Sequence, residues 1–302
     1  MADPWHFEKL RLKSGLNMQV ARAGVDSARP LVVMLHGFPE CWYSWRHQLR
    51  ALAPHFECVA PDLRGYGETD APVGVGNYSL DRLIGDVADL IEACGRQRAV
   101  FIAHDWGGAI AWATALQRSE LVERLIVMNC PHLKKFSDNL RHNPRQMLKS
   151  WYILFFQIPR LPEALMRARD FAMVKRMLRD SAVQKSAFSD EDLKHYRAAF
   201  RNPYSITAAI NYYRALFREN VRNRKPPAWM DNKISAPTMV IWGEQDVALR
   251  KELTFGMKEL FDGPFEIHYV SDSGHWVQQE KPALVNDCLL KFLAPIVVRR
   301  PH

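Results

Sequence analysis

An aspartate stands at the end of an apolar stretch, in a place where it could act as a nucleophile. Asp105 follows the apolar run 100–103, which is typical of a buried strand, and precedes the run 109–116, which is typical of a helix. Two small residues, Ala103 and Gly107, flank it on either side. This order of strand, tight turn and helix predicts a nucleophile elbow.

The residue type in the elbow decides which chemistry is available. A serine would form an acyl-enzyme with an ester or an amide. A carboxylate attacks an sp3 carbon that carries a strained or good leaving group, and it becomes an alkyl ester. Asp105 therefore favours an epoxide or an alkyl halide as the substrate. The competing interpretation is a simple helix N-cap, since Asp is a favoured residue at that position.

An alkyl ester of Asp105 needs a base for its hydrolysis, and the base needs an acid that orients it. In hydrolases with this elbow, the nucleophile, the acid and the histidine follow one another along the chain. Asp246 follows the apolar run 238–242, and His275 follows the run 265–270. Because both side chains lie on loops after expected strands, both can converge on Asp105. The sequence predicts a triad in which Asp246 orients His275, the general base.

Other polar residues near His275 are weaker candidates for the orienting acid. Asp272 and Glu280 share the loop of His275 and the helix after it, which leaves poor geometry for the far ring nitrogen. Asn129 follows another expected strand, but it is not an acid. Asp246 therefore remains as the candidate. Taken singly, it could be a turn residue, and His275 could be a polar residue at a helix start.

A second turn, residues 36–39, follows the long apolar run 31–35. Its place relative to the elbow predicts an oxyanion hole made by the backbone N–H groups of Phe38 and Trp106. This hole would hold the tetrahedral adduct that forms when water attacks the aspartyl ester. The alternative is an ordinary turn stiffened by proline. We also expect the side chains of Phe38, Trp106 and Trp276 to contact the substrate.

The elements that must position these residues alternate between strand and helix. This alternation predicts an α/β fold in which a mostly parallel sheet carries helices on both faces. Ser79 is the expected N-cap of one helix. Besides the runs named above, the expected elements are a hairpin of residues 7–12 and 18–23, strands at 57–60 and 125–128, and helices at 45–52, 78–94 and 282–293.

From about residue 134 to residue 228 the strand pattern stops, and the chain becomes helical, basic and rich in aromatic residues. We predict a helical lid domain here, inserted into a core domain made of residues 1–133 and 229–302. It would lie over the carboxyl ends of the strands, where such folds bind ligands.

The segment of the expected lid is strongly basic. Residues 141–225 hold 18 Lys and Arg against 7 Asp and Glu. Solvated helix faces explain this best; the alternative is a surface for anionic lipid or for an acidic substrate such as a fatty acid.

The composition, 48% apolar and 25% charged, is that of a soluble globular protein. The chain has no run of about 18 apolar residues that could span a membrane, and residues 1–6 lack a signal-peptide pattern. Five cysteines without a CxxC pair favour reduced thiols in the cytoplasm. Because zinc spacing, a P-loop, a dinucleotide motif and nucleic-acid signatures are missing, we expect no metal, no organic cofactor and no nucleic-acid partner. The tail 296–300 could touch a membrane surface weakly, although a frayed terminus is favoured.

Six short motifs are specific in combination and spread over nearly the whole chain: residues 36–40, 42–46, 62–67, 104–108, 274–276 and 279–282. Together they resemble those of the α/β-hydrolase-fold epoxide hydrolases, and most of all the epoxide hydrolase 3 and 4 branch. The resemblance implies that a lipophilic epoxide and water give a vicinal diol. Members of this branch often carry an N-terminal membrane anchor. Since this chain begins where a catalytic domain would, we expect a cytoplasmic protein unless such an anchor precedes it; the oligomeric state stays open.

The resemblance also implies two lid tyrosines that hydrogen-bond the epoxide oxygen and protonate the departing alkoxide. The motifs at 150–159 and 211–214 single out Tyr152 and Tyr213. A phenol with a pKa near 10 is a reasonable donor to an alkoxide. Tyr212 competes with Tyr213, because adjacent helix positions point about 100° apart and only one can face the site. The alternative for each of these tyrosines is a core aromatic on an amphipathic helix.

Two other functions remain as alternatives. Haloalkane dehalogenases resemble residues 104–108 and use the same nucleophile, but they commonly carry Asn where this chain has Phe38. Fluoroacetate dehalogenases typically have Arg where this chain has Trp106, and paired lid tyrosines suit an alkoxide better than a halide. A non-catalytic ligand-binding protein on the same fold is the second alternative. It predicts a broken triad, whereas the predicted triad is complete.

Overall fold

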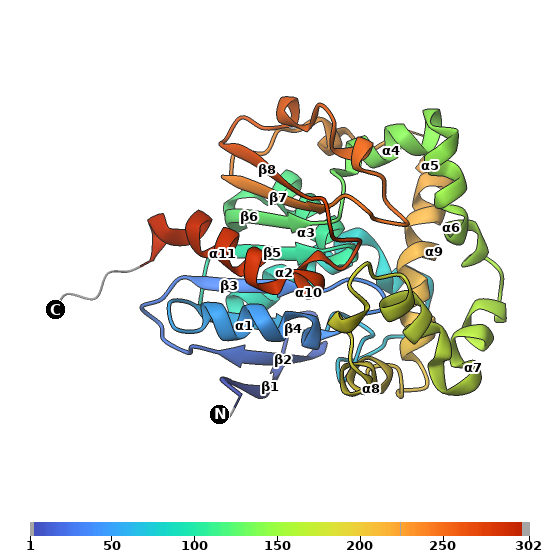
Figure 1. The fold of residues 1–302 in the computed structure, drawn as a ribbon, viewed down its shortest axis with the longest axis horizontal. Coiled ribbons are helices and arrows are strands. Elements are labelled where there is room, and N and C mark those ends of the chain that lie inside the picture. The colour runs from blue at the N-terminus through green and yellow to red at the C-terminus, as the bar shows by residue number, and fades with distance from the viewer. Residues whose placement is uncertain (1–2, 224, 298–302) are drawn as a thin grey trace.

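A twisted eight-stranded sheet runs through the centre of the computed structural model, which describes residues 3–223 and 225–297 (Figure 1). Its strand order is β1-β2-β4-β3-β5-β6-β7-β8. β1 pairs antiparallel with β2, and β2 with β4, whereas all neighbours from β4 to β8 are parallel. The strands are β1 (Trp5–Arg11), β2 (Asn17–Ala23), β3 (Leu31–Leu35), β4 (Glu57–Pro61), β5 (Ala99–His104), β6 (Val122–Met128), β7 (Thr238–Gly243) and β8 (Phe265–Val270).

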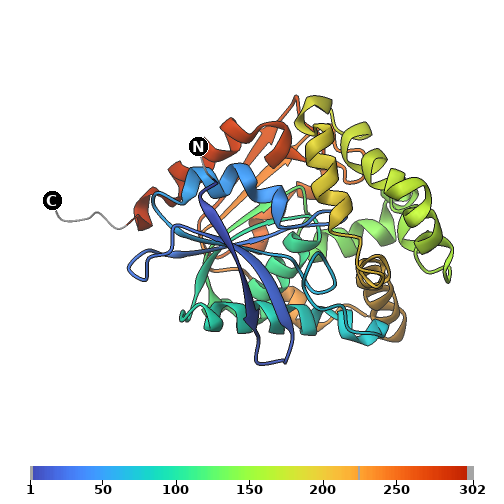
Figure 2. The same cartoon turned by 90° about the horizontal axis from the view of Figure 1, so that it is seen from below.

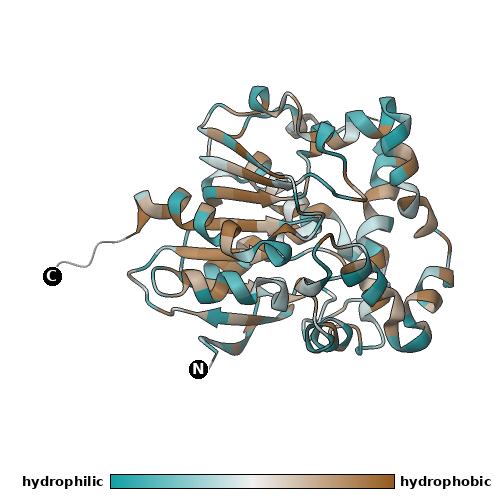
Figure 3. Ribbon diagram, in the orientation of Figure 1, coloured by the Kyte–Doolittle hydropathy of each residue, from teal (hydrophilic) through white to brown (hydrophobic). Residues whose placement is uncertain are grey.

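Helices cover both faces of the sheet, which explains why the central strands β3 and β5 are buried along their whole length. α1 (Arg46–Leu52), α10 (Val277–Glu280) and α11 (Pro282–Leu293) lie on one face. α2 (Leu80–Ala93) and α3 (Trp106–Gln117) lie on the other, as the view from below shows (Figure 2). Two hydrophobic clusters fill the space between the sheet and these helix layers. The strands are accordingly mostly brown in Figure 3, while many helices carry teal on their outer sides.

Six helices follow β6 and precede β7. They gather at the right of Figure 1, on the side of the sheet where the carboxyl ends of the parallel strands lie. α7 contains non-helical backbone at residues 168–171 and continues into a π-helical turn at Arg176–Asp180. The six helices are α4 (Leu133–His142), α5 (Pro144–Lys149), α6 (Trp151–Phe155), α7 (Leu161–Lys175), α8 (Asp190–Ala198) and α9 (Ser205–Asn223).

Short 3₁₀ helices connect the larger elements. The first of them leads directly into α1, and two others lie between β7 and β8. Their bounds are Trp42–Trp45, Val75–Tyr78, Ser119–Leu121, Lys185–Ala187, Ala228–Asp231, Lys251–Thr254, Met257–Leu260 and Ala294–Ile296.

The fold class and the order of elements agree with the sequence-based expectation, and the differences are local. β6 begins three residues before the expected strand, because the charged residues Glu123 and Arg124 interrupt the apolar run that marks it. Ser79 does occupy the N-cap position of α2, but its side chain makes no capping hydrogen bond. Residues 298–300 of the expected membrane-contacting tail lie outside the described residues. Within the described ranges, no helix combines the length and the apolar character needed to cross a bilayer.

Candidate active site

Asp105 lies on a strained turn between β5 and α3. Its backbone has φ 48° and ψ −119°, and residues other than glycine rarely adopt a positive φ. The turn packs so closely against the loop after β3 that a Cβ on Gly37 would come within 2.4 Å of the Asp105 Cβ. A Cβ on Gly107 would come within 2.1 Å of the Leu35 carbonyl oxygen. The small residues around the elbow are therefore required by close packing.

The side chain of Asp105 does not cap α3, although the residue occupies the N-cap position. Its Oδ1 accepts a hydrogen bond of 2.8 Å from the backbone N–H of Phe38. This is the first of the two predicted oxyanion-hole donors. The second belongs to Trp106, the first residue of α3, and first-turn amides have no acceptor within their own helix. The N-cap interpretation therefore does not account for the carboxylate.

The structure brings the three predicted triad residues together at the carboxyl edge of the sheet. His275, on the loop after β8, places Nε2 3.7 Å from Oδ2 of Asp105. Its other ring nitrogen, Nδ1, lies 2.6 Å from Oδ2 of Asp246 on the loop after β7. All three residues follow parallel strands, and such strands end at the same edge of the sheet. The imidazole therefore stands between two carboxylates.

Asp246 is held by three further donors, and the sequence analysis assigned none of them a role. Its Oδ1 accepts hydrogen bonds from the backbone N–H groups of Ala248 and Leu249, at 2.7 and 2.8 Å. Its Oδ2 accepts a bond of 2.8 Å from the side-chain amide of Asn129. Asn129 also accepts a bond of 2.9 Å from the N–H of Gly243. The sequence showed that Asn129 follows an expected strand, but it did not show that its side-chain amide holds the carboxylate of Asp246.

Burial and charge act in opposite directions on the His275–Asp246 pair. Burial disfavours the imidazolium, but the charge of Asp246 and its interactions with Asp105 outweigh it, and the pKa of His275 is raised well above its ordinary value. Burial likewise disfavours the carboxylate of Asp246, yet His275 and the surrounding donors lower its pKa. In the free site the pKa shifts therefore favour the protonated form of His275 and the ionised form of Asp246.

A second buried network, which the sequence did not predict, ties the elbow to the His275 loop. Glu40 is fully buried, and its carboxylate accepts hydrogen bonds from Gly37, Ser44 and Gln278 at 2.9, 2.7 and 3.1 Å. Its Oε2 lies 2.7 Å from Nδ1 of His104, the last residue of β5. In the sequence, the only indication of this network was that Glu40 belongs to the motif 36–40 and His104 to the motif 104–108.

The other nitrogen of His104 closes the connection. Its Nε2 lies 2.8 Å from the backbone oxygen of His275, and because a carbonyl oxygen can only accept, His104 donates here. Burial disfavours the charged form of Glu40, but His104 and the other donors lower the pKa of that carboxyl to about 2. The Glu40–His104 pair thus joins the nucleophile elbow to the loop of the base.

Tyr152 on α6 and Tyr213 on α9 line the cavity of Asp105, and the choice between the adjacent tyrosines of α9 is clear. Tyr213 lines the same cavity as Asp105 and Tyr152, and its ring lies 5.8 Å from that of Tyr152. Tyr212 points away and donates a hydrogen bond of 2.8 Å to the backbone oxygen of Arg64. Burial, followed by the negative charge of Asp105, raises the pKa of both Tyr152 and Tyr213, so both remain protonated donors.

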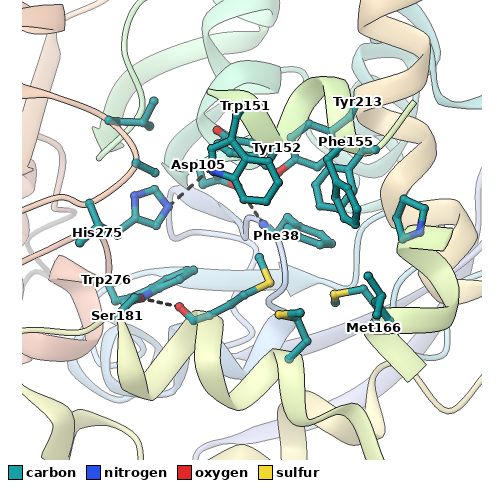
Figure 4. Close-up of a pocket in the computed structure, with 18 residues that line it drawn as sticks. Phe38, Asp105, Trp151, Tyr152, Phe155, Met166, Ser181, Tyr213, His275 and Trp276 are labelled. Carbon is teal, nitrogen blue, oxygen red and sulfur yellow. Dashed lines mark hydrogen bonds and ion pairs between the residues drawn. The ribbon is translucent and has the colours of Figure 1, made fainter. Parts of the chain in front are cut away.

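The cavity above Asp105 has a volume of about 290 Å³ and is almost entirely apolar. Figure 4 shows Asp105 between His275 and Phe38, with Tyr152 and Tyr213 close by. Its described lining contains no lysine or arginine, so the many cations of residues 141–225 do not reach into the cavity. The other lining residues are Trp151, Phe155, Phe156, Pro162, Leu165, Met166, Met173, Met177, Ser181, Val247, Ala248, Leu249 and Trp276.

The three predicted substrate-contacting side chains are placed differently. Phe38 and Trp276 line the main cavity. The indole N–H of Trp276 donates to the hydroxyl of Ser181 at 2.9 Å, which fixes its ring against the lid. Trp106 lines a smaller neighbouring cavity of about 70 Å³ that shares Asp105, Tyr152 and Tyr213 with the main one.

Asp272 and Glu280, which the sequence analysis rejected as the acid that orients His275, make other contacts. Glu280 accepts hydrogen bonds from the backbone N–H groups of Gly274 and Gln184, at 3.0 and 2.8 Å, and so joins the His275 loop to the helical segment. Asp272 is exposed and pairs with Lys281. Throughout residues 3–223 and 225–297, no three His, Cys, Asp or Glu side chains are grouped to hold a metal ion.

Known proteins match this chain along most of its length. Residues 30–282 match the family model of the alpha/beta hydrolase fold. The chain is 38% identical to human epoxide hydrolase 4 over 289 residues, which cover 94% of this chain and 78% of that protein. It is 36% identical to epoxide hydrolase 3 of Xenopus tropicalis over 94% of this chain and 77% of that protein. A crystal structure of Bacillus megaterium epoxide hydrolase in complex with an inhibitor superposes with a TM-score of 0.86 at 30% identity, covering 96% of this chain and 100% of that one.

The sheet topology, the elbow and the family match together define the class of protein. The chain belongs to the α/β-hydrolase-fold family, and within that family to the epoxide hydrolases. The expected resemblance to the epoxide hydrolase 3 and 4 branch is confirmed.

Proposed function

We propose that this enzyme hydrolyses lipophilic epoxides to vicinal diols through a covalent ester of Asp105. One observation carries the proposal: Asp105, flanked by His275 at 3.7 Å, faces a cavity that Tyr152 and Tyr213 also line. A carboxylate nucleophile, a base and two phenol donors are the groups that opening an epoxide and cleaving an ester require. The almost wholly apolar lining supports a lipophilic substrate.

The first step is attack by Oδ2 of Asp105 on an epoxide carbon. Oδ1 is already bound to the Phe38 amide, which leaves Oδ2 as the oxygen that turns toward the substrate. The C–O bond of the epoxide breaks, and the resulting alkoxide takes a proton from Tyr152 or Tyr213. The imidazolium of His275 supplies the replacement proton to the phenol. Asp105 is then a neutral ester, and His275 is a neutral base.

The second step is hydrolysis of this ester. His275, held by Asp246 at 2.6 Å, removes a proton from water, and the oxygen of that water attacks Cγ of Asp105. The Phe38 and Trp106 amides stabilise the oxyanion on Oδ1. The adduct collapses, the second product oxygen leaves with the remaining proton of the added hydroxyl, and Asp105 returns as a carboxylate beside protonated His275. One oxygen of the diol therefore comes from Asp105.

We propose that residues 134–228 form the lid of this site and that the remainder forms the core. Helices α4 to α9 contribute Tyr152, Tyr213 and most of the apolar lining, while the turns and loops after β5, β7 and β8 carry Asp105, Asp246 and His275. In this division the core performs the covalent chemistry, and the lid recognises the epoxide and excludes bulk water.

We also propose that the enzyme works in a reducing compartment such as the cytoplasm. All five cysteines are free thiols in the structure, and three of them are buried in it. Fractionation of cells that express the full-length protein would test this proposal. Its partners in the reaction are the epoxide and water alone.

The covalent route is tested with His275→Ala, which should form the Asp105 ester and fail to hydrolyse it. The variant is incubated separately with a lipophilic terminal epoxide and with a bromoalkane of equal length, and peptide mass spectrometry locates the adduct. We expect an adduct on Asp105 from the epoxide alone. An adduct from the bromoalkane alone would reassign the enzyme as a dehalogenase, and none from either would support a ligand-binding protein.

Isotope labelling of the wild-type enzyme provides an independent check. In a single turnover in heavy-oxygen water, the new diol oxygen should be unlabelled and the label should appear in Asp105. Label in the diol of the first turnover would rule out the ester.

A further inference from the structure

Large apolar side chains are exposed on one strip of the lid. Leu148 on α5 is 75% exposed, and Trp151 and Leu154 on α6 are 62% and 63% exposed. These helices and the start of α7 form the outer edge of the molecule at the right of Figure 1, and the turn between α6 and α7 is brown in Figure 3. We call this strip the apolar patch; its other members are Met147, Ile158, Leu161 and Leu165, together with Val247 on the adjoining loop after β7.

The apolar patch surrounds the entrance of the active-site cavity. Trp151, Leu165 and Val247 are exposed to solvent and also line the cavity, so the cavity opens between them. An apolar path thus runs from the surface of the lid to Asp105. Exposed apolar side chains that gather around one opening mark a binding face, whereas singly scattered ones do not.

Positive charge borders the apolar patch. The stretch 141–169 contains six Lys and Arg residues and a single acid, Glu163. That acid is buried and paired with Arg214 at 2.6 Å, so it does not offset the surface charge. The six cations, five of them exposed, are Arg141, Arg145, Lys149, Arg160, Arg167 and Arg169.

Carboxylates of neighbouring elements leave this excess in place. Glu252 lies in the same surface hollow as Arg145, but its side chain is bound to Arg250 at 3.1 Å. Asp170 follows the cationic stretch and is paired with Arg197 at 2.7 Å. The border of the apolar patch is therefore positive on α5, on the turn after α6 and on α7.

We propose that the apolar patch docks onto the surface of an anionic lipid bilayer, with its apolar side chains in the interface and its cations against the headgroups. An apolar centre with Trp and Leu inside a ring of Lys and Arg is the composition that such surfaces bind. A second copy of this chain fits less well, because pairing two such faces would bring two cationic rings together. Docking turns the cavity entrance toward the membrane, where a lipophilic substrate concentrates.

The proposal goes beyond the epoxide chemistry and is tested apart from it. The full chain is sedimented with phosphatidylcholine vesicles that contain either 30% phosphatidylserine or none. The test variant is Leu148→Glu/Leu154→Glu, because neither residue lines the cavity. The matched control is Val25→Glu/Leu284→Glu, which alters exposed apolar residues on the loop before β3 and on α11.

We expect the wild type and the control to bind the anionic vesicles, and the test variant to bind at least about tenfold more weakly. Binding should also be weaker on neutral vesicles and at high salt. Equal binding of test and control variants, or no binding of the wild type to anionic vesicles, would overturn the proposal. A wild-type dimer that the test variant dissociates, without vesicle binding, would assign the apolar patch to self-association instead. Circular dichroism and turnover of a short water-miscible epoxide, unchanged in the test variant, show that fold and site are intact.

Discussion

The charge of a single residue, Asp105, contributes to the protonation of several groups around it. Its carboxylate raises the pKa of His275, Tyr152 and Tyr213 in the free site, in addition to the effects of burial and of Asp246. Ester formation removes this charge. The same event therefore makes His275 easier to deprotonate, when a base is needed, and makes the two phenols stronger acids, when an alkoxide has to be protonated.

This coupling predicts different pH profiles for the two chemical steps. Hydrolysis of the ester needs neutral His275, so its rate should fall about tenfold per pH unit below the pKa of His275 in the ester. Because the charge of Asp105 is absent there, that pKa should be lower than the pKa of His275 in the free enzyme. Single-turnover kinetics gives the first value, and NMR titration of the His275 imidazole gives the second.

Asp246→Asn is the matched control for the pH experiment, since it removes the other carboxylate that raises the pKa of His275. It should lower the pKa of His275 in both the free enzyme and the ester. Equal values of this pKa before and after ester formation in the wild type would contradict the coupling.

At the scale of the element, the register of α9 decides which of its tyrosines takes part in the reaction. We expect Tyr213→Phe to slow ester formation about a hundredfold, because a proton donor to the alkoxide is lost. Tyr212→Phe should change that rate by less than about threefold. It should instead destabilise the fold by about 1 kcal/mol, because the Arg64 carbonyl oxygen loses its donor at 2.8 Å. Stopped-flow kinetics and urea unfolding separate the two effects, and equal rate losses would contradict the assignment.

The sequence could predict those parts of the site whose pattern lies in a short, contiguous stretch of the chain. The turn at Asp105 was predictable because a buried strand, two small residues and a helix are contiguous in the chain. Asp246 and His275 were placed by their positions after strands, which parallel topology converts into proximity. The role of Asn129 was not predictable in this way, since its hydrogen bond to Asp246 joins residues 117 positions apart. The Glu40–His104 pair depends equally on tertiary packing, which carries no periodic signal.

At the scale of the whole molecule, the structure separates the charge of the lid from the substrate cavity. The sequence showed a basic lid, and from that pattern alone a carboxylate-bearing substrate such as a fatty acid was a reasonable alternative. The structure directs these cations outward, while the described cavity lining carries only one carboxylate, Asp105, and one imidazole, His275, as its charged groups. Which side of a helix faces a cavity depends on how the helices pack, and the short helices α5 and α6 have too few turns to show a periodic pattern.

This separation predicts how activity depends on the length and charge of the substrate. For unbranched terminal epoxides, kcat/KM should rise about two- to fourfold per added methylene until the chain fills the cavity of about 290 Å³. A terminal carboxylate on a short chain should lower kcat/KM strongly, since it would be buried beside Asp105, and the one cationic group there, His275, already faces Asp105 and Asp246. On a chain long enough to leave the entrance the penalty should vanish, because the carboxylate then meets solvent and the basic border of the apolar patch. Paired neutral and carboxylated epoxides of increasing length, assayed in detergent-free buffer below their micelle concentrations, measure this directly. A carboxylate that increases kcat/KM even on the shortest chains would contradict it, because it would require a cation in the cavity besides His275.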